Sequence, residues 1–244
     1  MDDSMKLYWE IYFKNVPNEK VINQITNPIR GYEEELVDGA IIDIGCGQSP
    51  FLLDFSWMDR EIIAVDNEQS QLNFLKQRAL KQDDCNIDNW KFCLLEYPKE
   101  DIPDKIYSLI IFANFLHFFS LKKCIEIVEN IQKNTTKGTL IYVSVHSHKF
   151  YENNPNDLNN NDYFKHYFTP EDLETVFKKG SFERMYIAEI EKIDSTDERS
   201  LVSKWFDKAC RKEGNTNQKK IDVYKSEYLK NKTQSDIIAI FRKR

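Results

Sequence analysis

The chain has few glycines and prolines, and its cysteines do not form pairs. Its 244 residues include seven glycines and seven prolines, so two glycines close together need a structural reason. The five cysteines form no CxxC pair and their number is odd, which argues against a disulfide framework and a cysteine zinc site. No apolar run reaches about 18 residues and the first residues are acidic, so we expect no membrane span and no signal peptide. These absences predict a cytoplasmic protein with reduced thiols.

The chain also lacks an overall positive charge, although one part of it is basic. The formal net charge is −6, yet residues 199–244 contain 13 Lys and Arg against five Asp and Glu, a local net charge of +8. The other residues therefore carry −14, which disfavours a nucleic-acid partner for most of the protein. We interpret the basic stretch as a solvated helical face; a surface that docks an anionic substrate is the alternative.

Apolar runs of strand length alternate with helical patterns along the chain. The runs show little polar alternation, which is typical of strands buried on both faces of a parallel sheet. Five runs come first and two later strands follow: 40–44, 61–66, 90–95, 107–113, 139–145, 182–193 and 236–244. This alternation predicts an α/β fold with a doubly wound, mostly parallel sheet.

Helical patterns fill the intervals between these runs. "SQLNFLKQRALK" and "SLKKCIEIVENIQKN" repeat apolar residues at helical spacing, and Gly138 is expected to end the second helix. "FTPEDLETVFKKG" predicts a helix with Thr169 as N-cap, Pro170 at the first position and Asp172 reaching back to the cap.

We expect one domain over residues 1–244. An N-terminal helical segment covers 1–35, the core sheet covers 36–194 and 233–244, and a charged helical insertion covers 195–232. The insertion carries an amphipathic stripe formed by Leu201, Val202, Trp205, Phe206 and Ala209.

The run "IIDIGCGQSP" places two of the seven glycines directly after the first predicted strand. Gly45 and Gly47 permit positive φ angles and leave no Cβ between the backbone and a ligand. The crevice at the carboxyl ends of central strands is the usual ligand site in an open α/β sheet. Asp43 puts a carboxylate inside the same apolar run. We therefore expect a ligand that approaches this loop closely and carries positive charge.

Two classes of cofactor use such a loop. A dinucleotide site needs a third glycine where Pro50 stands, and Asp43 has the wrong charge to lie near a pyrophosphate. S-adenosylmethionine (SAM) has an amino group and a sulfonium but no phosphate. Asp66 ends the next strand, where its carboxylate can accept both ribose hydroxyl protons of either cofactor. Glu96 ends the third strand, where it can accept from an adenine amino group while Leu95 or Tyr97 packs on the ring.

These segments resemble the class I SAM-dependent methyltransferases. The matching pieces are "DIGCGQS", "VDNE", "LLEYP", "FANFLHFF" and "KGTLIYVSV", within residues 36–194 and 234–244. The family often has a third glycine where this chain has Ser49. The resemblance implies a seven-stranded sheet with its last strand antiparallel, and SAM as the cofactor. The implied cofactor-binding residues are Asp43, Gly45, Cys46, Gly47, Asp66, Asn67, Glu96, Tyr97 and Asn114.

The resemblance also places candidate catalytic and substrate residues. His117 and His146 follow the fourth and fifth strands, where each can act as a base or as a hydrogen-bond partner of the acceptor; local packing is the alternative. His148 is expected on the substrate side, and since no third ligand is evident we expect no metal. Trp9 and Tyr12 would belong to an N-terminal lid over the sulfonium, with ordinary helix packing as the alternative.

The predicted function is methyl transfer from SAM to a small-molecule acceptor by in-line displacement. The chain has no [DNS]-P-P-[YFW] run and no Pro-Cys pair, which disfavours the nucleic-acid methyltransferases that use them. One alternative is a protein or tRNA methyltransferase that docks its substrate through the basic residues 195–244. Another is a SAM-binding regulatory subunit without catalysis.

Overall fold

The structure, a computed structural model, describes residues 3–15, 28–47, 50–193, 196–229 and 233–244. The chain divides into two compact units, which are described separately. The helical unit comprises Met1–Thr26 and Lys192–Gln234, and the sheet unit comprises Asn27–Glu191 and Ser235–Arg244. Ser49, which precedes the predicted helix start at Pro50, lies outside the described residues.

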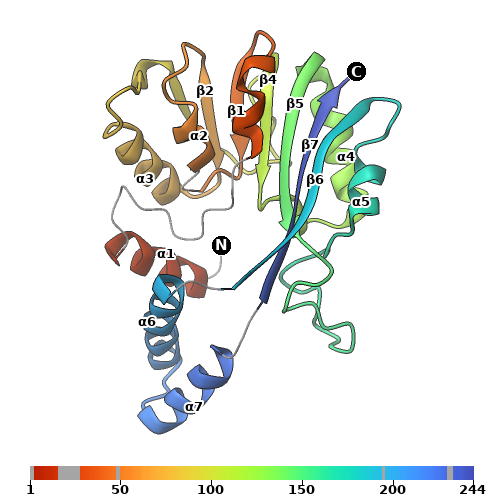
Figure 1. The fold of residues 1–244 in the computed structure, drawn as a ribbon. Coiled ribbons are helices and arrows are strands. Elements are labelled where there is room, and N and C mark those ends of the chain that lie inside the picture. The colour runs from red at the N-terminus through yellow and green to blue at the C-terminus, as the bar shows by residue number, and fades with distance from the viewer. Residues whose placement is uncertain (1–2, 16–27, 48–49, 194–195, 230–232) are drawn as a thin grey trace. The chain divides into compact units, whose positions relative to one another are not determined.

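Seven strands among the described residues form one sheet in the order β3-β2-β1-β4-β5-β7-β6 (Figure 1). The strands are β1 (Ala40–Ile44), β2 (Ile62–Asp66), β3 (Trp90–Leu94), β4 (Tyr107–Ala113), β5 (Thr135–His146), β6 (Phe182–Ile193) and β7 (Thr233–Lys243). The first five pair in parallel, and β7 pairs antiparallel with β5. This is the predicted doubly wound sheet with an antiparallel last strand.

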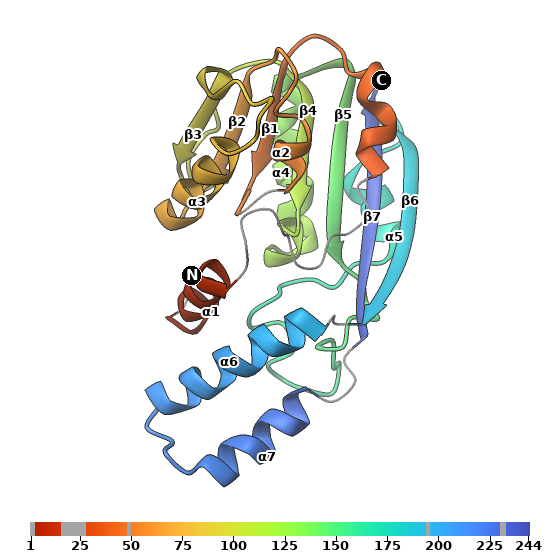
Figure 2. The same ribbon diagram turned by 60° about the vertical axis from the view of Figure 1, so that its left-hand side comes forward.

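Helices cover both faces of the sheet (Figures 1 and 2). The α-helices of the sheet unit are α2 (Pro50–Asp54), α3 (Gln69–Ala79), α4 (Leu121–Ile131) and α5 (Pro170–Val176). Short 3-10 helices are η1 (Pro28–Glu35), η2 (Ile87–Asn89), η3 (Leu116–Phe118) and η4 (Gln132–Asn134). Figure 2 shows α2 and α3 on one face and α4 on the other, so the carboxyl edge of the central strands stays uncovered by these helices.

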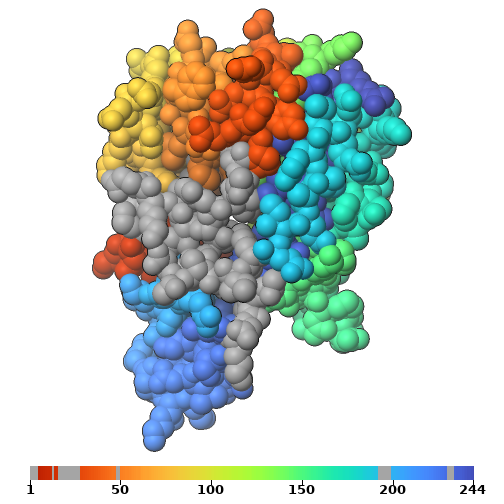
Figure 3. Space-filling view, in the orientation of Figure 1, coloured from red at the N-terminus to blue at the C-terminus, as the bar shows by residue number. Residues whose placement is uncertain are grey.

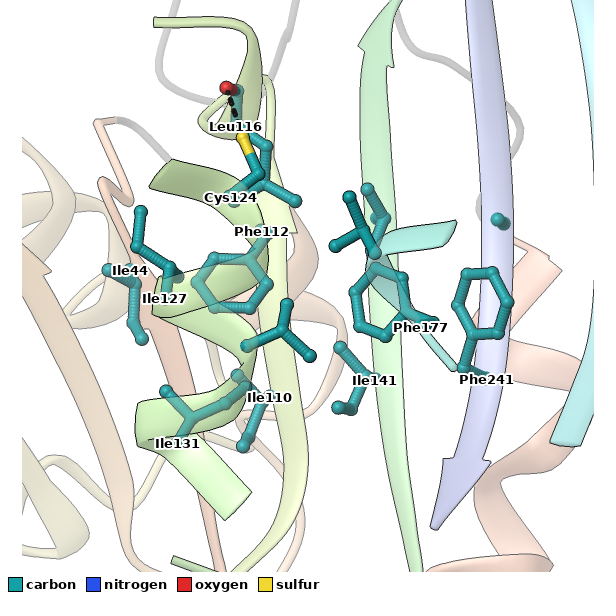
Figure 4. Packing of buried hydrophobic residues seen from close by; sticks show 14 of the residues in the cluster. Ile44, Ile110, Phe112, Leu116, Cys124, Ile127, Ile131, Ile141, Phe177 and Phe241 are labelled. Carbon is teal, nitrogen blue, oxygen red and sulfur yellow. Dashed lines mark hydrogen bonds between the residues drawn. The ribbon is translucent and has the colours of Figure 1, made fainter. Parts of the chain in front are cut away.

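The face under α4 and α5 holds the largest part of the core (Figure 4). Ile127 and Ile131 of α4 are buried with Ile110 and Phe112 of β4. Each fully buried side chain of this size contributes about 1.5–3 kcal/mol. This packing holds the ends of β1, β4 and β5 in fixed positions, which is what a binding site at that edge requires.

Gly138 does not end a helix, contrary to the expectation from the sequence. The helix α4 ends at Ile131, and Gly138 lies inside β5 with a φ of 95°. A Cβ at this position would come 2.6 Å from Cγ1 of Val37. The glycine is therefore explained by a close approach of two distant segments, which local sequence patterns do not contain.

The helical unit contains α1 (Asp3–Asn15), α6 (Thr196–Lys212) and α7 (Gln218–Tyr228). Tyr12 and Leu201 are buried together with Ile11, and Trp205 packs against this cluster. Leu201 and Trp205 of the predicted amphipathic stripe therefore pack on α1, whereas Phe206 contacts Tyr228 of α7. No helix in the described ranges has the length and hydropathy that a membrane crossing demands. The division into a lid, a core sheet and an insertion within one domain stays a prediction.

The predicted capping box at the start of α5 is present, and replacing Thr169 by alanine should cost about 1 kcal/mol of stability. Thr169 Oγ1 accepts the Asp172 N–H, and the Asp172 carboxylate accepts the Thr169 N–H. Burial alone would raise the pKa of Asp172, but bonds from Thr169 and His166 lower it below its ordinary value. The contribution of the Asp172 carboxylate to stability should therefore be present above a pH of about 4 and lost as the pH falls further.

Chemical denaturation of the Thr169→Ala variant at neutral and acid pH measures this effect. The matched control is Thr175→Ala, because Thr175 is exposed and its hydroxyl donates to the Glu171 carbonyl inside the same helix instead of capping its start. A loss in Thr175→Ala as large as that in Thr169→Ala would contradict the capping interpretation.

Candidate active site

A bend of main chain after β1 forms the centre of the site; residues 45–47 are called the glycine bend. Gly45 and Gly47 have φ angles of 72° and 49°, which disfavour other residues. The N–H groups of Gly45 and Cys46 both donate to the Val65 carbonyl at 2.9 Å. The bend is therefore fixed to the end of the neighbouring strand β2 before any ligand is bound.

The carboxylate of Asp66 fixes the bend a second time. Its Oδ2 accepts the Gly47 N–H at 2.8 Å and its Oδ1 accepts the Glu68 N–H at 2.9 Å. Burial raises the pKa of Asp66, although these backbone donors act in the opposite direction. Each carboxylate oxygen can still accept a further hydrogen bond, as a ribose diol would require. Asn67, the next predicted cofactor residue, is exposed beside it.

Asp43 and Cys46 are buried side chains of this segment. Asp43 is fully buried in β1, and Cys46 is a buried residue of the bend itself. Burial raises the pKa of the Cys46 thiol well above its ordinary value, and the charges of Asp43 and Asp66 raise it further. Cys46 is therefore a small neutral side chain in this bend and not a nucleophile.

Phe115 lies against the glycine bend, and the sequence patterns did not single it out. A Cβ on Gly45 would overlap Cδ2 of the Phe115 ring. The ring stacks on Phe112 with centroids 5.8 Å apart and lies 6.4 Å from the Tyr97 ring. The signal available in the sequence was an aromatic residue directly after Asn114 in "FANFLHFF". Phe115 and Tyr97 thus supply an aromatic wall beside the bend.

Tyr97 and Glu96 both follow the third strand, and of the two only Tyr97 belongs to this wall. Burial raises the pKa of Tyr97 to about 12, so the phenol stays neutral. Its Oη is buried and has no hydrogen-bond partner among the described residues. Glu96 is exposed, and one of its carboxylate oxygens lies 2.7 Å from Lys99 Nζ. Contact of Glu96 with an adenine amino group stays a prediction.

Asn114 follows β4 in a left-handed conformation with a φ of 53°. Its N–H donates to the Ser144 carbonyl at 2.9 Å, and the Ser144 hydroxyl donates to Asn114 Oδ1 at 3.3 Å. A non-glycine residue in this conformation costs about 1–2 kcal/mol and occurs preferentially at functional sites. Asn114 is exposed and precedes Phe115, so it lies next to the glycine bend.

His146 ends β5 and is held on both faces. Its ring stacks between His117, with centroids 4.0 Å apart, and Phe150, at 3.9 Å. Its Nδ1 lies 2.7 Å from Oδ1 of Asp236, the residue opposite it on β7. Sequence patterns did not single out Asp236; the available signal was an acidic residue at the start of an apolar strand. The pair joins the last parallel strand to the antiparallel one.

His117 lies behind His146 and away from solvent. It is 1% exposed, and its Nδ1 accepts the backbone N–H of His146 at 3.2 Å. Burial, and to a lesser extent His146, lowers the pKa of His117 well below its ordinary value. The ring is therefore neutral with its proton on Nε2. This geometry makes His117 a support for His146 and does not favour proton transfer by His117 itself.

Aromatic rings surround the two histidines and form a group called the aromatic cluster. Its members come from η3 and from the loop after β5: Phe118, Phe150, Tyr163, Phe164 and Tyr167. Phe164 lies edge-on to His146 at 4.6 Å. Phe118 and Tyr163 keep 38% and 45% of their surface exposed. The loop lies at the surface of the sheet unit (green, lower right of Figure 3), so part of the cluster can meet a ligand.

The other predicted substrate residues are His148, Trp9 and Tyr12. His148 is exposed, and its Nδ1 is 3.9 Å from Oε1 of Glu189, which also bonds to Lys149. Trp9 and Tyr12 belong to the helical unit, so their lid role stays a prediction. In the described part of the chain, no three His, Cys, Asp or Glu side chains gather as metal ligands would.

The carboxyl ends of β1, β2, β4 and β5 thus bring the bend, Asp66, Asn114 and His146 to one edge of the sheet (Figure 1). A comparison with protein families finds that residues 37–191 match the methyltransferase domain. The chain belongs to this family. Its domain is a class I SAM-dependent methyltransferase domain, and SAM is the methyl donor.

The proteins named here share little sequence identity with the methyltransferase. A curated relative, (S)-tetrahydroprotoberberine N-methyltransferase from Eschscholzia californica, is 23% identical over 150 residues, 60% of this chain and 41% of the relative. The chain thus spans about two-fifths of that protein. The solved structure of coclaurine N-methyltransferase bound to N-methylheliamine and SAH has a TM-score of 0.61 and 13% identity, over 98% of this chain and 86% of the other. TehB from Haemophilus influenzae has a TM-score of 0.61 and 16% identity, over 91% and 63%.

The residues present fit SAM. Gly47 has no side chain, and nothing closer than the Gln71 Oε1, at 3.9 Å, would meet a Cβ placed there. That amide oxygen is buried and has no hydrogen-bond partner among the described residues. A donor on a ligand at the bend would satisfy it, as ribose hydroxyls would satisfy Asp66. The sequence did not single out Gln71, whose position in α3 resembled that of any helix residue.

Proposed function

We propose that the methyltransferase transfers a methyl group to the nitrogen of a small-molecule amine that carries an aromatic ring. The aromatic cluster around His146 carries this proposal, because ring faces attract ammonium groups and pack on aromatic ligands. The N-methyltransferase names of the Eschscholzia relative and of the coclaurine enzyme support it. In-line displacement needs a nucleophile held in a dry pocket, and rings provide such walls.

In this proposal each group of residues at the carboxyl edge of the sheet has a separate role. The glycine bend admits the cofactor backbone, and Asp66 accepts the ribose hydroxyls. Tyr97 and Phe115 pack beside the adenine, and Asn114 lies at the methionine end. SAM supplies an activated methyl group on its sulfonium. Asp43, buried in β1 just before the bend, supplies negative charge that suits a cationic cofactor, and Cys46 is a small buried side chain of the bend.

Calorimetry with SAM, S-adenosylhomocysteine (SAH) and NAD, followed by an acceptor screen, tests the proposal. We expect both sulfur compounds to bind and NAD not to bind. Amines that carry an aromatic ring should then be methylated with release of SAH, whereas ethers of the same shape should not react. Binding of NAD without SAM or SAH would refute the cofactor site. Binding of SAH with no turnover of any acceptor, amine or phenol, would favour the regulatory-subunit alternative.

The salt dependence of acceptor binding separates a small amine from a polyanion. The basic stretch of residues 199–244 would dock a tRNA through several phosphate contacts, and affinity would then fall about 10³-fold between about 50 and about 200 mM salt. A small amine should change its KM less than about threefold over this range, since it makes at most one ion pair. Steady-state kinetics at both salt concentrations measure this, and a steep decrease would favour the macromolecular alternative.

A further inference from the structure

The hydrogen bond between His146 and Asp236 determines which ring nitrogen of His146 carries the hydrogen. The Asp236 side chain is 4% exposed and that of His146 is 14% exposed, so water competes little for their hydrogen bond. A carboxylate only accepts, so His146 Nδ1 carries the hydrogen of the 2.7 Å bond. The neutral ring then has its lone pair on Nε2. This is the tautomer that a proton acceptor needs at that nitrogen.

The surroundings of the ring keep this arrangement fixed. His117 and Phe150 cover its two faces, and Phe164 lies at its edge. The pairing of β5 with β7 places Asp236 opposite His146, so the backbone also keeps the two side chains together. Rotation of the ring would break the Asp236 bond and both stacks. The lone pair of Nε2 therefore has a constant direction.

The position of the pair connects it to the reaction. Ser144, two residues before His146 on β5, holds Asn114 beside the glycine bend. Asn114 and His146 thus follow the ends of two neighbouring strands, and an amine whose aromatic ring packs in the aromatic cluster would lie against His146. An alkylamine is protonated at neutral pH and has no free lone pair, so it cannot attack a methyl group until it loses a proton.

We propose that His146 is the catalytic base for this amine and that Asp236 is its positioning residue; this rests on the proposed function. The acceptor's N–H bond breaks, the proton goes to His146 Nε2, and the electron pair stays on nitrogen. That pair forms the new N–C bond as the C–S bond breaks, and the electrons of the C–S bond stay on sulfur. The imidazolium, stabilised by Asp236, later passes its proton to water.

The kinetic test compares Asp236→Asn, Asp236→Glu and His146→Ala with tetrahydroisoquinoline as the probe. Asp236→Asn and His146→Ala should each lower kcat about 100-fold, while the Kd for SAH changes less than about twofold. Asp236→Glu should recover part of the rate. Added imidazole should recover part of the rate of His146→Ala, because the deletion leaves a ring-sized space between His117 and Phe150.

A second histidine–carboxylate pair provides the matched control. His166 Nε2 lies 3.1 Å from Asp172 Oδ2 in a more exposed position at the start of α5. The variant His166→Gln should keep kcat within about twofold of the native value. An equal loss in His166→Gln and Asp236→Asn would show a general structural effect and overturn the assignment.

Nuclear magnetic resonance gives a readout that does not depend on activity. The chain has four histidines, so the ¹⁵N shifts of their rings can be assigned by substitution. His146 should carry its hydrogen on Nδ1 in the native protein and on Nε2 in Asp236→Asn. A native His146 with its hydrogen on Nε2 would overturn the proposal.

The outcomes separate this inference from the proposed function. Failure of SAH to bind the native protein refutes the proposed function itself. Binding of SAH with no methylation of tetrahydroisoquinoline overturns the ammonium acceptor, and naphthol as a second probe shows whether a phenol takes its place. Native-like kcat in Asp236→Asn overturns the role of Asp236 alone.

Discussion

Replacing Gly45 by valine should raise the Kd for SAH at least about 1000-fold. The φ of 72° costs a β-branched residue about 1–3 kcal/mol, and its Cβ would overlap the Phe115 ring. The ring must then move, which disturbs its stack on Phe112 and the aromatic wall beside the bend. Strain and obstruction act together here, so binding should suffer far more than folding.

Two control glycines separate these causes. Gly214 has a φ of 85° and open space around its Cβ, so Gly214→Val carries the strain without the collision. Gly180 has neither the backbone strain nor the collision, so Gly180→Val should be nearly neutral. Calorimetry with SAH and thermal unfolding should be measured for all three variants. SAH affinity in Gly45→Val within about tenfold of native would refute the placement of the cofactor at the bend.

Replacing Asp66 by alanine should weaken SAH binding about 1000-fold. The change removes two bonds that hold the bend, from Gly47 and Glu68, and the acceptor that we propose for both ribose hydroxyls. A hydrogen bond to a charged group contributes about 1.5–3 kcal/mol, and about 1.4 kcal/mol corresponds to a factor of ten. Calorimetry measures the change. Asp84→Ala, at an exposed site between α3 and β3, should bind SAH as the native protein does.

The pH dependence of Asp66 has opposite signs for binding and for folding. Burial raises its pKa, so the carboxylate is lost on acidification earlier than for an exposed aspartate, and SAH affinity should fall with it. For the unliganded protein, the contribution of Asp66 to stability is complete below a pH of about 4 and is lost as the pH rises through the raised pKa. Asp66→Asn should remove both dependences. A pH-independent SAH affinity in the native protein would contradict a role of the ionised group.

The sheet could be predicted because its signals are local. Uniformly apolar runs mark strands buried on both faces, and "GCG" after the first of them marks a turn that side chains would obstruct. Parallel strands bring their carboxyl ends to one edge, so Asp66, Asn114 and His146 could be expected near the bend. Gly138 could not be interpreted correctly, since Val37 approaches it from a distant segment.

The finer chemistry of the site depends on contacts between distant residues. Asp236 is 90 residues from His146, and only the antiparallel register of β5 and β7 sets them opposite each other. His117 could be placed at the site from sequence, but its burial behind His146 depends on how η3 and the loop after β5 pack. Local patterns give residue types and strand ends, whereas ring stacking and tautomers come from tertiary packing.

The neutral Cys46 thiol in the bend has a consequence for the resistance of the enzyme to alkylation. A sulfonium methyl donor alkylates thiolates readily, and Cys46 lies in the very loop that would receive this donor. Because burial and the charges of Asp43 and Asp66 keep that sulfur protonated, it is a poor competitor for the methyl group. The same carboxylates that suit a cationic cofactor therefore also protect the protein from being modified by it, turnover after turnover.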